Sequence, residues 1–236
     1  YDGNLAVNPL FVDPGNGDYH LQSYVGHWTP NGFVRDARTS PCIDGGDPAS
    51  DASREPGPNE GAIEMGRYGN TWQASLSSLI DTSTPGYQET NASRQAGVII
   101  TFSRVVDQQS LQDHLALYEL GDVASASTRG APVSGKTYWL VPGKKMRYAP
   151  DQPLAANKSY LVYIAPGVVR KNGKPYSGSG ELEFATRRRP VVLYYSPEGT
   201  VAPGKRTPIR IVFDQPMHRG SLLFGLDIEP WQNGVF

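Results

Sequence analysis

The residues best suited to chemistry lie in one loop-rich stretch near the start of the chain. Its acidic side chains alternate with glycine and proline: Asp44, Asp47, Asp51, Glu55, Glu60 and Glu64. Calcium takes about 6–8 oxygen ligands in loose geometry, so Asp44, Asp47 and Asp51 are candidate calcium ligands. Their spacing does not match an EF-hand loop. Aspartates also cap turns by bonding their own backbone, and this is the favoured interpretation.

Acid/base work on a sugar is a second chemistry that paired carboxylates allow. Asp44 and Asp47 could do it only if their carboxyl groups were held about 5–10 Å apart, and spacing across a loop does not fix a separation. The sequence lacks the nucleophile-elbow, zinc-protease, dinucleotide and phosphate-loop motifs. The histidines are scattered over different predicted domains: His20, His27, His114 and His218. We therefore assign no catalytic residue and expect no enzyme activity from this segment.

A single cysteine, Cys42, excludes an intramolecular disulfide and any multi-thiolate metal site. It lies between Pro41 and Ile43, which favours a buried, inert thiol over a nucleophile. No cofactor is required by any motif, and calcium is the one that the acidic loops allow.

Aromatic residues raise a further alternative, because they could form a platform on which sugars stack. The candidates are the tyrosines and Trp28, Trp72, Trp139 and Trp231. Aromatic residues on strands more often face a core. In the alternating stretch Tyr138-Trp139-Leu140, either Trp139 or its two neighbours must face solvent, and the sequence does not decide which.

Composition and charge narrow the class of protein. The 236 residues carry 22 Lys+Arg against 23 Asp+Glu, a net charge of -1, so nothing indicates a nucleic-acid or anionic-membrane partner. No apolar run approaches the ~18 residues of a membrane span. The sequence starts at Tyr1, and its first residues contain neither a start methionine nor a signal-sequence pattern. We expect the sequence to be part of a longer chain, cut at both ends.

Three regions differ in texture. Residues 1–71 are dense in Asn, Asp, Gly and Pro, which predicts turns and short strands. From residue 72 a stretch without helix-breaking Gly or Pro leads to a turn-forming cluster at 82–86. We interpret residues 72–83 as a linker. Beyond it, β-branched and aromatic segments predict strands at 98–102, 115–118, 137–141, 145–148, 159–164 and 181–185. About seven short strands in about 100 residues are typical of an immunoglobulin-like sandwich.

An internal repeat suggests a second sandwich after the arginine run at 187–189. Val98–Ser103 precedes Ser110-Leu111, and the similar Ile209–Asp214 precedes Ser221-Leu222 at the same offset of 111 residues. The arginine run itself is interpreted as solvated charge at a domain junction.

The first 71 residues resemble the closing coils of a secreted right-handed parallel β-helix of the pectate-lyase-like superfamily. The resemblance rests on three motifs in the family's order: residues 8–21, 40–48 and 61–71. Arg67 stands where the family usually has alanine in the terminal motif. In such enzymes the catalytic groups lie on central coils, which this sequence does not contain.

Residues ~84–187 resemble a bacterial immunoglobulin-like domain of S-layer and other surface proteins. The resemblance rests on residues 99–103, 148–160 and 182–186, and the segment Phe213–Met217 matches the family's early strand even more closely. Both resemblances imply an exported bacterial protein.

The sequence thus predicts an all-β chain with four parts. These are the end of a parallel β-helix (1–71), a linker (72–83), an immunoglobulin-like sandwich (84–187) and the truncated start of a second one (188–236). The implied function is a non-catalytic structural or adhesive segment of a bacterial cell-surface or extracellular protein. Its partners would be cell-wall or extracellular polysaccharide, or other surface-protein chains. The alternative is an accessory C-terminal part of a secreted polysaccharide lyase or glycoside hydrolase, active on upstream coils.

Overall fold

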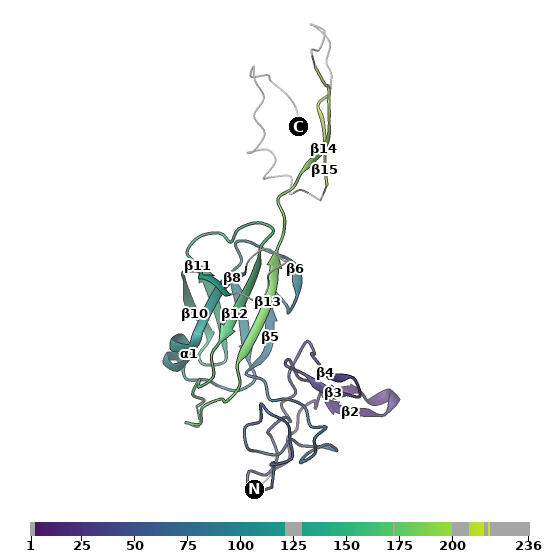
Figure 1. The fold of residues 1–236 in the computed structure, drawn as a ribbon, viewed down its shortest axis with the longest axis vertical. Coiled ribbons are helices and arrows are strands. Elements are labelled where there is room, and N and C mark those ends of the chain that lie inside the picture. Colours follow the sequence, from purple (N-terminus) through teal and green to yellow (C-terminus); the bar gives the residue numbers. More distant parts are fainter. Residues whose placement is uncertain (1–2, 121–128, 172, 200–207, 215–216, 218–236) are drawn as a thin grey trace. The chain divides into compact units, whose positions relative to one another are not determined.

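The structure is a computed structural model of the chain, and it describes all residues except 1–2, 121–128, 172, 200–207, 215–216 and 218–236 (Figure 1). The chain divides into two compact units, Tyr1–Arg187 and Arg188–Phe236. Among the described residues, strands are found in both units, and the helices are the short η1 (Pro14–Asn16) and α1 (Gln108–His114). Among the described residues, no helix has the length and apolar character needed to cross a bilayer.

The centre of the first unit is a sandwich of two sheets. One sheet has the strand order β10-β11-β7-β5 and the other β6-β13-β12-β8-β9. The strands are β5 (Ile80–Thr84), β6 (Glu89–Ala92), β7 (Val98–Phe102), β8 (Leu115–Leu120), β9 (Arg129–Pro132), β10 (Gly135–Val141), β11 (Lys145–Pro150), β12 (Ser159–Ile164) and β13 (Gly180–Thr186). The six strands expected from β-branched and aromatic runs are all present. The expected immunoglobulin-like sandwich is therefore confirmed at the level of fold.

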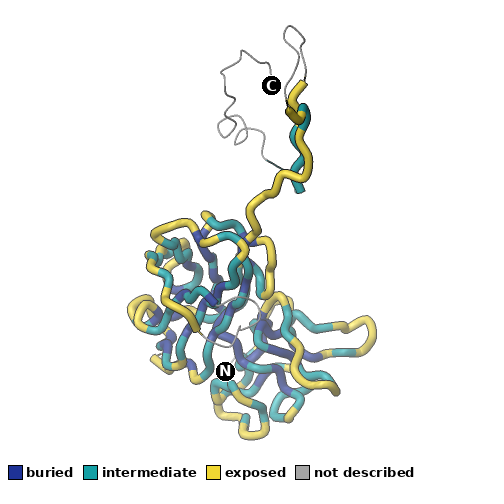
Figure 2. Tube along the Cα trace, turned by 45° about the horizontal axis from the view of Figure 1, so that its top comes forward, coloured by how far each residue is buried: buried dark blue, intermediate teal, exposed yellow. Residues whose placement is uncertain are grey.

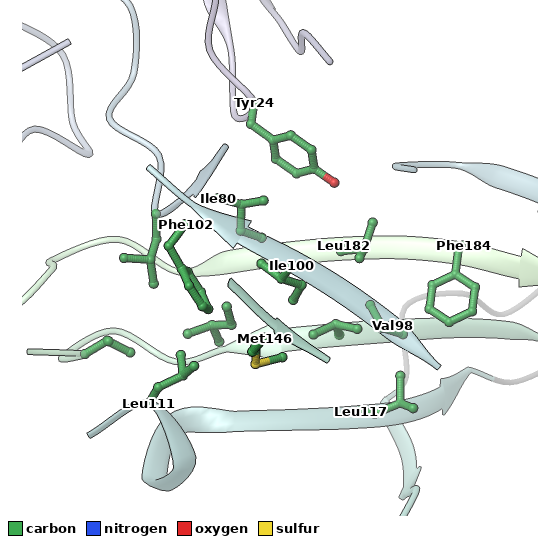
Figure 3. Packing of buried hydrophobic residues seen from close by; sticks show 14 of the residues in the cluster. Tyr24, Ile80, Val98, Ile100, Phe102, Leu111, Leu117, Met146, Leu182 and Phe184 are labelled. Atoms are coloured by element: carbon green, nitrogen blue, oxygen red, sulfur yellow. The ribbon is translucent and has the colours of Figure 1, made fainter. Parts of the chain in front are cut away.

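Alternation of side chains along the strands builds the core. In β7, Val98, Ile100 and Phe102 are fully buried while the residues between them are only partly covered, and β12 and β13 show the same period of two. Figure 3 shows the β7 side chains and Met146 of the neighbouring β11 in one cluster with Leu117 and Phe184 from the facing sheet. Buried segments follow the strands of both sheets in Figure 2. The alternation of buried and partly covered residues therefore determines which side chains form the interior of the sandwich.

Residues 3–79, called here the N-terminal segment, consist of turns and two small hairpins. The hairpins are β1 (Phe11–Asp13) with β2 (Asp18–Leu21), and β3 (His27–Thr29) with β4 (Gly32–Val34). Both are antiparallel, and the parallel pairing found among the described strands is β6 with β13 in the sandwich. The parallel coils expected for residues 1–71 are therefore not seen. The physical reason is local: tight turns at 14–17 and 29–32 fold each short strand back on its neighbour.

The stretch expected as a linker, residues 72–83, behaves differently from a solvated connection. Ala74, Leu79 and Ile80 are almost completely buried, and β5 begins at Ile80 as part of the first sheet. The Ser75 hydroxyl donates to the Leu21 carbonyl, and the Leu76 carbonyl accepts from the Ser23 hydroxyl, so hydrogen bonds in both directions tie this stretch to β2 and the loop after it. The stretch without Gly and Pro breakers, interpreted from the sequence as a linker, is therefore an extended and largely buried segment.

The second unit, by itself, is described as one antiparallel hairpin of β14 (Val192–Ser196) and β15 (Arg210–Phe213). Its pairing repeats that of β5 with β7, including a register shift two residues wide at the start of the first strand. The sequence repeat therefore corresponds to a repeated antiparallel strand pair. Ser221 and Leu222, which complete the repeat in the sequence, lie outside the described residues.

Candidate functional site

The acidic loop residues lie where the N-terminal segment meets the sandwich. The Ser77 hydroxyl donates to the Asp44 carboxylate, whose two oxygens lie 2.8 and 2.6 Å from Ser77 Oγ, and the Glu60 amide donates to it at 3.3 Å. Burial raises the pKa of the Asp44 carboxyl, and the bonds from Ser77 and Glu60 oppose that rise. Asp44 therefore ties two loops of the segment together.

Asp47 and Asp51 do not join Asp44. Asp47 is exposed and accepts from the Ala49 amide at 2.9 Å, and Asp51 accepts from the Ser53 amide at 2.9 Å. The bond from Ser53 lowers the pKa of Asp51. In the part of the chain that the structure describes, no group of three or more acidic, histidine or cysteine side chains could hold a metal ion. The geometry supports turn capping for these residues and gives the calcium hypothesis no support.

A buried ion pair, which the sequence did not reveal, crosses from the N-terminal segment to the sandwich. The Glu60 carboxylate pairs with the Arg170 guanidinium, and both side chains are less than a tenth exposed. Burial and the nearby Asp44 raise the pKa of Glu60, while Arg170 lowers it. Nothing in the sequence relates two residues 110 positions apart. The only signal was a lone arginine after an apolar pair in Val168-Val169-Arg170.

Two further side chains of the sandwich reach into the same junction. Arg104 donates to the carbonyl oxygens of Pro41 (3.2 Å) and Ile43 (2.6 Å), and Tyr176 donates to the Ser77 carbonyl at 2.7 Å. Burial raises the pKa of the Tyr176 phenol above its ordinary value. These contacts satisfy backbone carbonyls that loops would otherwise bury without partners.

Glu64 and Glu55 are two further carboxylates of the N-terminal segment near Asp44. Glu64 is 3% exposed and accepts from the Ser75 amide at 3.0 Å. Desolvation raises its pKa to about 8, and the Glu55 and Asp44 carboxylates add to that rise. Glu55 accepts from the amides of Glu64 (2.9 Å) and Asn70 (2.8 Å). These carboxyl groups therefore act as acceptors that order turns.

The junction also has a hydrophobic component. Tyr24, from the loop between β2 and β3, is 3% exposed and belongs to the core cluster of the sandwich; Figure 3 shows it entering from above Ile80. Its hydroxyl lies 2.8 Å from that of Ser83 on β5. Nearby, Thr39 donates to the Ile80 carbonyl at 2.7 Å. The core of the sandwich thus includes Tyr24 of the N-terminal segment.

A shallow groove of about 440 Å³ opens beside this junction. Arg35 and Pro58 line it from the N-terminal segment, and Ser177 and Glu181 line it from the sandwich. The Arg35 guanidinium donates to the Glu181 carbonyl at 3.3 Å and lies 4.3 Å from the centre of the Tyr87 ring. Arg35 is therefore one more bridge between the two parts.

The histidines considered as ligands have local partners. His20 and His27 each contact an aspartate through Nδ1, Asp18 at 2.6 Å and Asp36 at 2.8 Å. His114, at the end of α1, lies 2.7 Å from the Ser110 carbonyl. His218 lies outside the described residues. Cys42 is a free, buried thiol in a small cluster with Leu21 and Ile43, in agreement with its interpretation as an inert core residue.

The tryptophans separate into two environments. Trp139 turns inward against the core, with its ring 6.0 Å from that of Phe102, whereas Tyr138 and Leu140 are about half exposed. The structure therefore answers the question that the sequence left open: Trp139 faces the core, and its two neighbours face solvent. Trp28 and Trp72 meet at a distance of 5.0 Å in the N-terminal segment. Trp231 lies outside the described residues.

Comparison with known families assigns two parts of the chain. Residues 78–186 match the family model described as a bacterial Ig-like domain, and residues 1–46 match one described as disaggregatase related. No curated protein sequence is similar to the chain.

Solved structures share similarity over about half of the chain. The copper resistance protein PcoC from Escherichia coli is 20% identical with a TM-score of 0.38, covering 46% of this chain and 98% of that one. Domains 1–6 of the surface layer protein SbsC are 17% identical with a TM-score of 0.33, covering 46% and 14%. L,D-transpeptidase 3 from Mycobacterium tuberculosis is 14% identical with a TM-score of 0.29, covering 48% and 38%.

The chain therefore spans only a small share of the surface layer protein, and these similarities assign it no function. The family match and the two-sheet sandwich agree over one region of the chain. Residues 78–186 of this all-β chain form an immunoglobulin-like domain.

Proposed function

We propose that this chain is a non-catalytic structural segment of an exported bacterial surface or extracellular multidomain protein. The observation that carries the proposal is the junction in the first unit. There the N-terminal segment and the immunoglobulin-like domain share a core through Tyr24 and are joined by the buried Glu60–Arg170 pair. A stiff connection between neighbouring parts is what a structural spacer needs.

The chemistry of the junction favours one fixed arrangement. Removing one partner of a buried ion pair costs about 3–5 kcal/mol, because the remaining charge is left without compensation. Sliding the two parts against each other would separate Glu60 from Arg170 in that way. It would also strip Arg104 from the carbonyls of Pro41 and Ile43. The junction therefore resists bending.

The domain arrangement is part of the proposal. Residues 78–186 supply an immunoglobulin-like domain, and residues 188–236 the start of a second, supported by the antiparallel β14–β15 pair, which resembles the β5–β7 pair. Domains in series that each bury a core of their own can extend a surface protein without a cofactor. The β-helix interpretation of residues 1–71 rests on the three sequence motifs alone.

A distance measurement tests the stiffness of the junction. Spin labels at the exposed positions Asn31 and Gln112, in a Cys42→Ser background, report the two parts separately. We expect one narrow distance distribution for the native junction and a broad one for Arg170→Met. Arg129→Met is the matched control, because its guanidinium stacks on Tyr163 of the same domain, 3.7 Å away. A broad distribution before any junction mutation would refute the stiff junction.

The milder variant Tyr24→Phe guards against simple misfolding, since it keeps the ring in the core and removes only the contact with Ser83. We expect it to remain folded, with a distribution between those of the native protein and Arg170→Met.

Two assays test the remaining parts of the proposal. Antibodies against the chain should label intact source cells, and labelling only after permeabilisation would contradict a surface location. The purified chain should release neither reducing ends nor unsaturated sugars from polysaccharides. Turnover by the chain itself would instead favour the enzyme alternative.

A further inference from the structure

The two sheets of the sandwich present outer faces of opposite charge. Because side chains alternate along a strand, the positions between the buried ones turn outward. On β10 and β11 these outward positions include Lys136, Lys145 and Arg147, while Met146, between two of them, is completely buried. We call the outer surface formed by Lys136, Tyr138, Lys145 and Arg147 the basic face.

Within the described strands of this sheet, no carboxylate balances the charges of the basic face. The strands β5, β7, β10 and β11 contain one acidic residue, Asp81, whose carboxylate lies 3.3 Å from the Arg38 guanidinium in the N-terminal segment. Arg147 donates through Nε to the Ala96 carbonyl at 3.1 Å, which leaves its charge uncompensated. In the part of the chain that the structure describes, none of the three cations of the basic face forms an ion pair.

The outer face of the opposite sheet carries the complementary charge. Outward positions of β13 hold Glu181 and Glu183, and Leu182 between them is completely buried. Across the sheet, Glu183 lies opposite Leu161 of β12, and Glu181 lies opposite Tyr163. We call the surface formed by these two glutamates and their two β12 neighbours the acidic face. Neither glutamate forms an ion pair with another described residue.

Two guanidiniums approach the acidic face, but other groups already bind them. Arg129 stacks on the Tyr163 ring, 3.7 Å from its centre, and Arg35 donates to the backbone carbonyl of Glu181 at 3.3 Å. Neither guanidinium pairs with the carboxylates of Glu181 and Glu183 in the described structure. The carboxylates can therefore accept a cation from outside the domain.

The charges on the two faces have the same spacing. Lys145 and Arg147 are two residues apart on β11, and Glu181 and Glu183 are two residues apart on β13. At about 3.3 Å per residue, the two members of each set are roughly 7 Å apart along the strand. A β13 strand laid along a β11 strand could therefore form two ion pairs at once.

Apolar side chains flank the charges on both faces. Arg147 lies between Tyr138 of β10 and Ile99 of β7 in the strand register, and Tyr138 is 52% exposed. On the acidic face, Leu161 and Tyr163 are only partly covered. Contact between the two faces would bury apolar area and lower the dielectric around the ion pairs, which strengthens them.

We propose that the basic face of one copy of this chain binds the acidic face of a second copy. Charge complementarity is the argument for this occupant, because one domain carries both halves of the contact. An anionic polymer would fit the basic face alone. A contact between two different faces leaves one face of each kind free in a dimer, so it can continue from copy to copy as an open chain. This interaction goes beyond the structural role proposed above and does not depend on it.

Sedimentation velocity of the whole 236-residue chain, over a range of protein concentrations, tests the proposal. We expect the average sedimentation coefficient to rise with protein concentration at about 0.01 M salt and to stay constant at about 1 M salt. Between these conditions the Debye length falls from about 30 Å to about 3 Å, which screens ion pairs at a surface. No association at low salt would overturn the proposal. Association that persists at high salt would overturn it too, because it would indicate an apolar contact.

Charge reversal identifies the two faces. Lys145→Glu/Arg147→Glu reverses the charge of the basic face, and Glu181→Lys/Glu183→Lys reverses that of the acidic face. Each double variant alone should self-associate at least about tenfold more weakly than the native protein, since like charges then meet. An equimolar mixture of the two variants should associate again, because each supplies the face that the other has lost. Recovery in the mixture also shows that both variants are folded.

Lys171→Glu/Arg189→Glu is the matched control. Both positions are exposed and lie outside the strands of the sandwich, and the net charge changes as in the variant of the basic face, so association should be unchanged. Native-like association of either charge-reversed variant, or no recovery in the mixture, would contradict the proposal. Binding of polyglutamate to the basic face without self-association would assign that face to an anionic polymer instead. None of these results would affect the distance test of the stiff junction.

Discussion

At the scale of single residues, Glu64 has the strongest effect of pH on stability that the structure indicates. Desolvation raises its pKa to about 8 from an ordinary value of 4.5. The folded protein therefore keeps a proton that the unfolded chain has released at neutral pH. For a carboxyl group with a raised pKa, stability is highest below the unfolded value and is lost as the pH rises towards the folded one. The window for this loss runs from about pH 4.5 to about pH 8.

Glu64→Gln should remove this pH dependence, because the amide stays neutral and its oxygen can still accept from the Ser75 amide. We expect the variant and the native protein to melt alike near pH 5. As the pH rises to 9, the variant should become progressively more stable than the native protein, by as much as about 4 kcal/mol. Thermal unfolding followed by circular dichroism across this range measures the difference. Glu198→Gln, at an exposed position, is the control and should show no trend. A constant difference at all pH values would contradict the assignment.

Asp44, Asp47 and Asp51 are the residues on which the calcium hypothesis rests. Each carboxylate already accepts hydrogen bonds from donors in different turns, Ser77, Ala49 and Ser53. We therefore expect EDTA to leave the melting temperature unchanged. A fall in melting temperature that added calcium reverses would restore the calcium hypothesis.

At the scale of elements, β10 is the edge strand whose two faces differ most clearly in their environment. Trp139 packs on the core beside Phe102, while Tyr138 and Leu140 point to the other face and are about half exposed. Alternation dictates that the two sets separate. The pairing of β10 with β11 determines which set faces inward, since it sets Trp139 opposite the fully buried Met146.

Alanine substitutions on β10 should therefore have unequal effects. Trp139→Ala should destabilise the domain by about 2–3 kcal/mol, somewhat below the ~3–5 kcal/mol of a completely buried tryptophan. Tyr138→Ala should change stability by no more than about 0.5 kcal/mol. Urea unfolding monitored by circular dichroism compares the two. Equal losses would mean that the strand is turned or shifted in register.

At the scale of the whole molecule, the chain consists of two units that meet at an arginine run. Arg187, Arg188 and Arg189 are exposed, whereas Thr186 just before them is 2% exposed in β13. Within the second unit, Arg188 also pairs with Asp214 at 2.8 Å. Domain boundaries of this kind are preferred sites of proteolysis.

Brief digestion with trypsin should cut first after Arg187 or Arg188 and leave residues 1–187 as a resistant core. Mass spectrometry of the products identifies the cut. Early cleavage after Arg38 or Arg54, both exposed in the N-terminal segment, would indicate that this segment is less firmly held than the junction contacts imply. The products would then separate the N-terminal segment from the sandwich.

The sandwich could be predicted from the sequence because its signals are local. Period-two alternation in Val98–Phe102 and Ser159–Ile164 fixes both the strand and its buried face within five or six residues. The repeat of Val98–Ser103 at Ile209–Asp214 likewise predicted a second copy of the same strand, which is β15. Residues 72–83 and 1–71 were harder, because sparse breakers and short apolar pieces do not distinguish a linker or a coil from buried, hairpin-forming chain.

By itself, then, the sequence determined the all-β class, the immunoglobulin-like domain, and the buried thiol of Cys42. Only the tertiary structure decided which side chains meet. It paired Glu60 with Arg170, placed Tyr24 in the core of the next domain, and brought Trp28 and Trp72 together. Strand patterns are encoded by neighbours a few residues apart. Ion pairs and ring contacts between distant loops depend on the path of the whole chain, which no local period records.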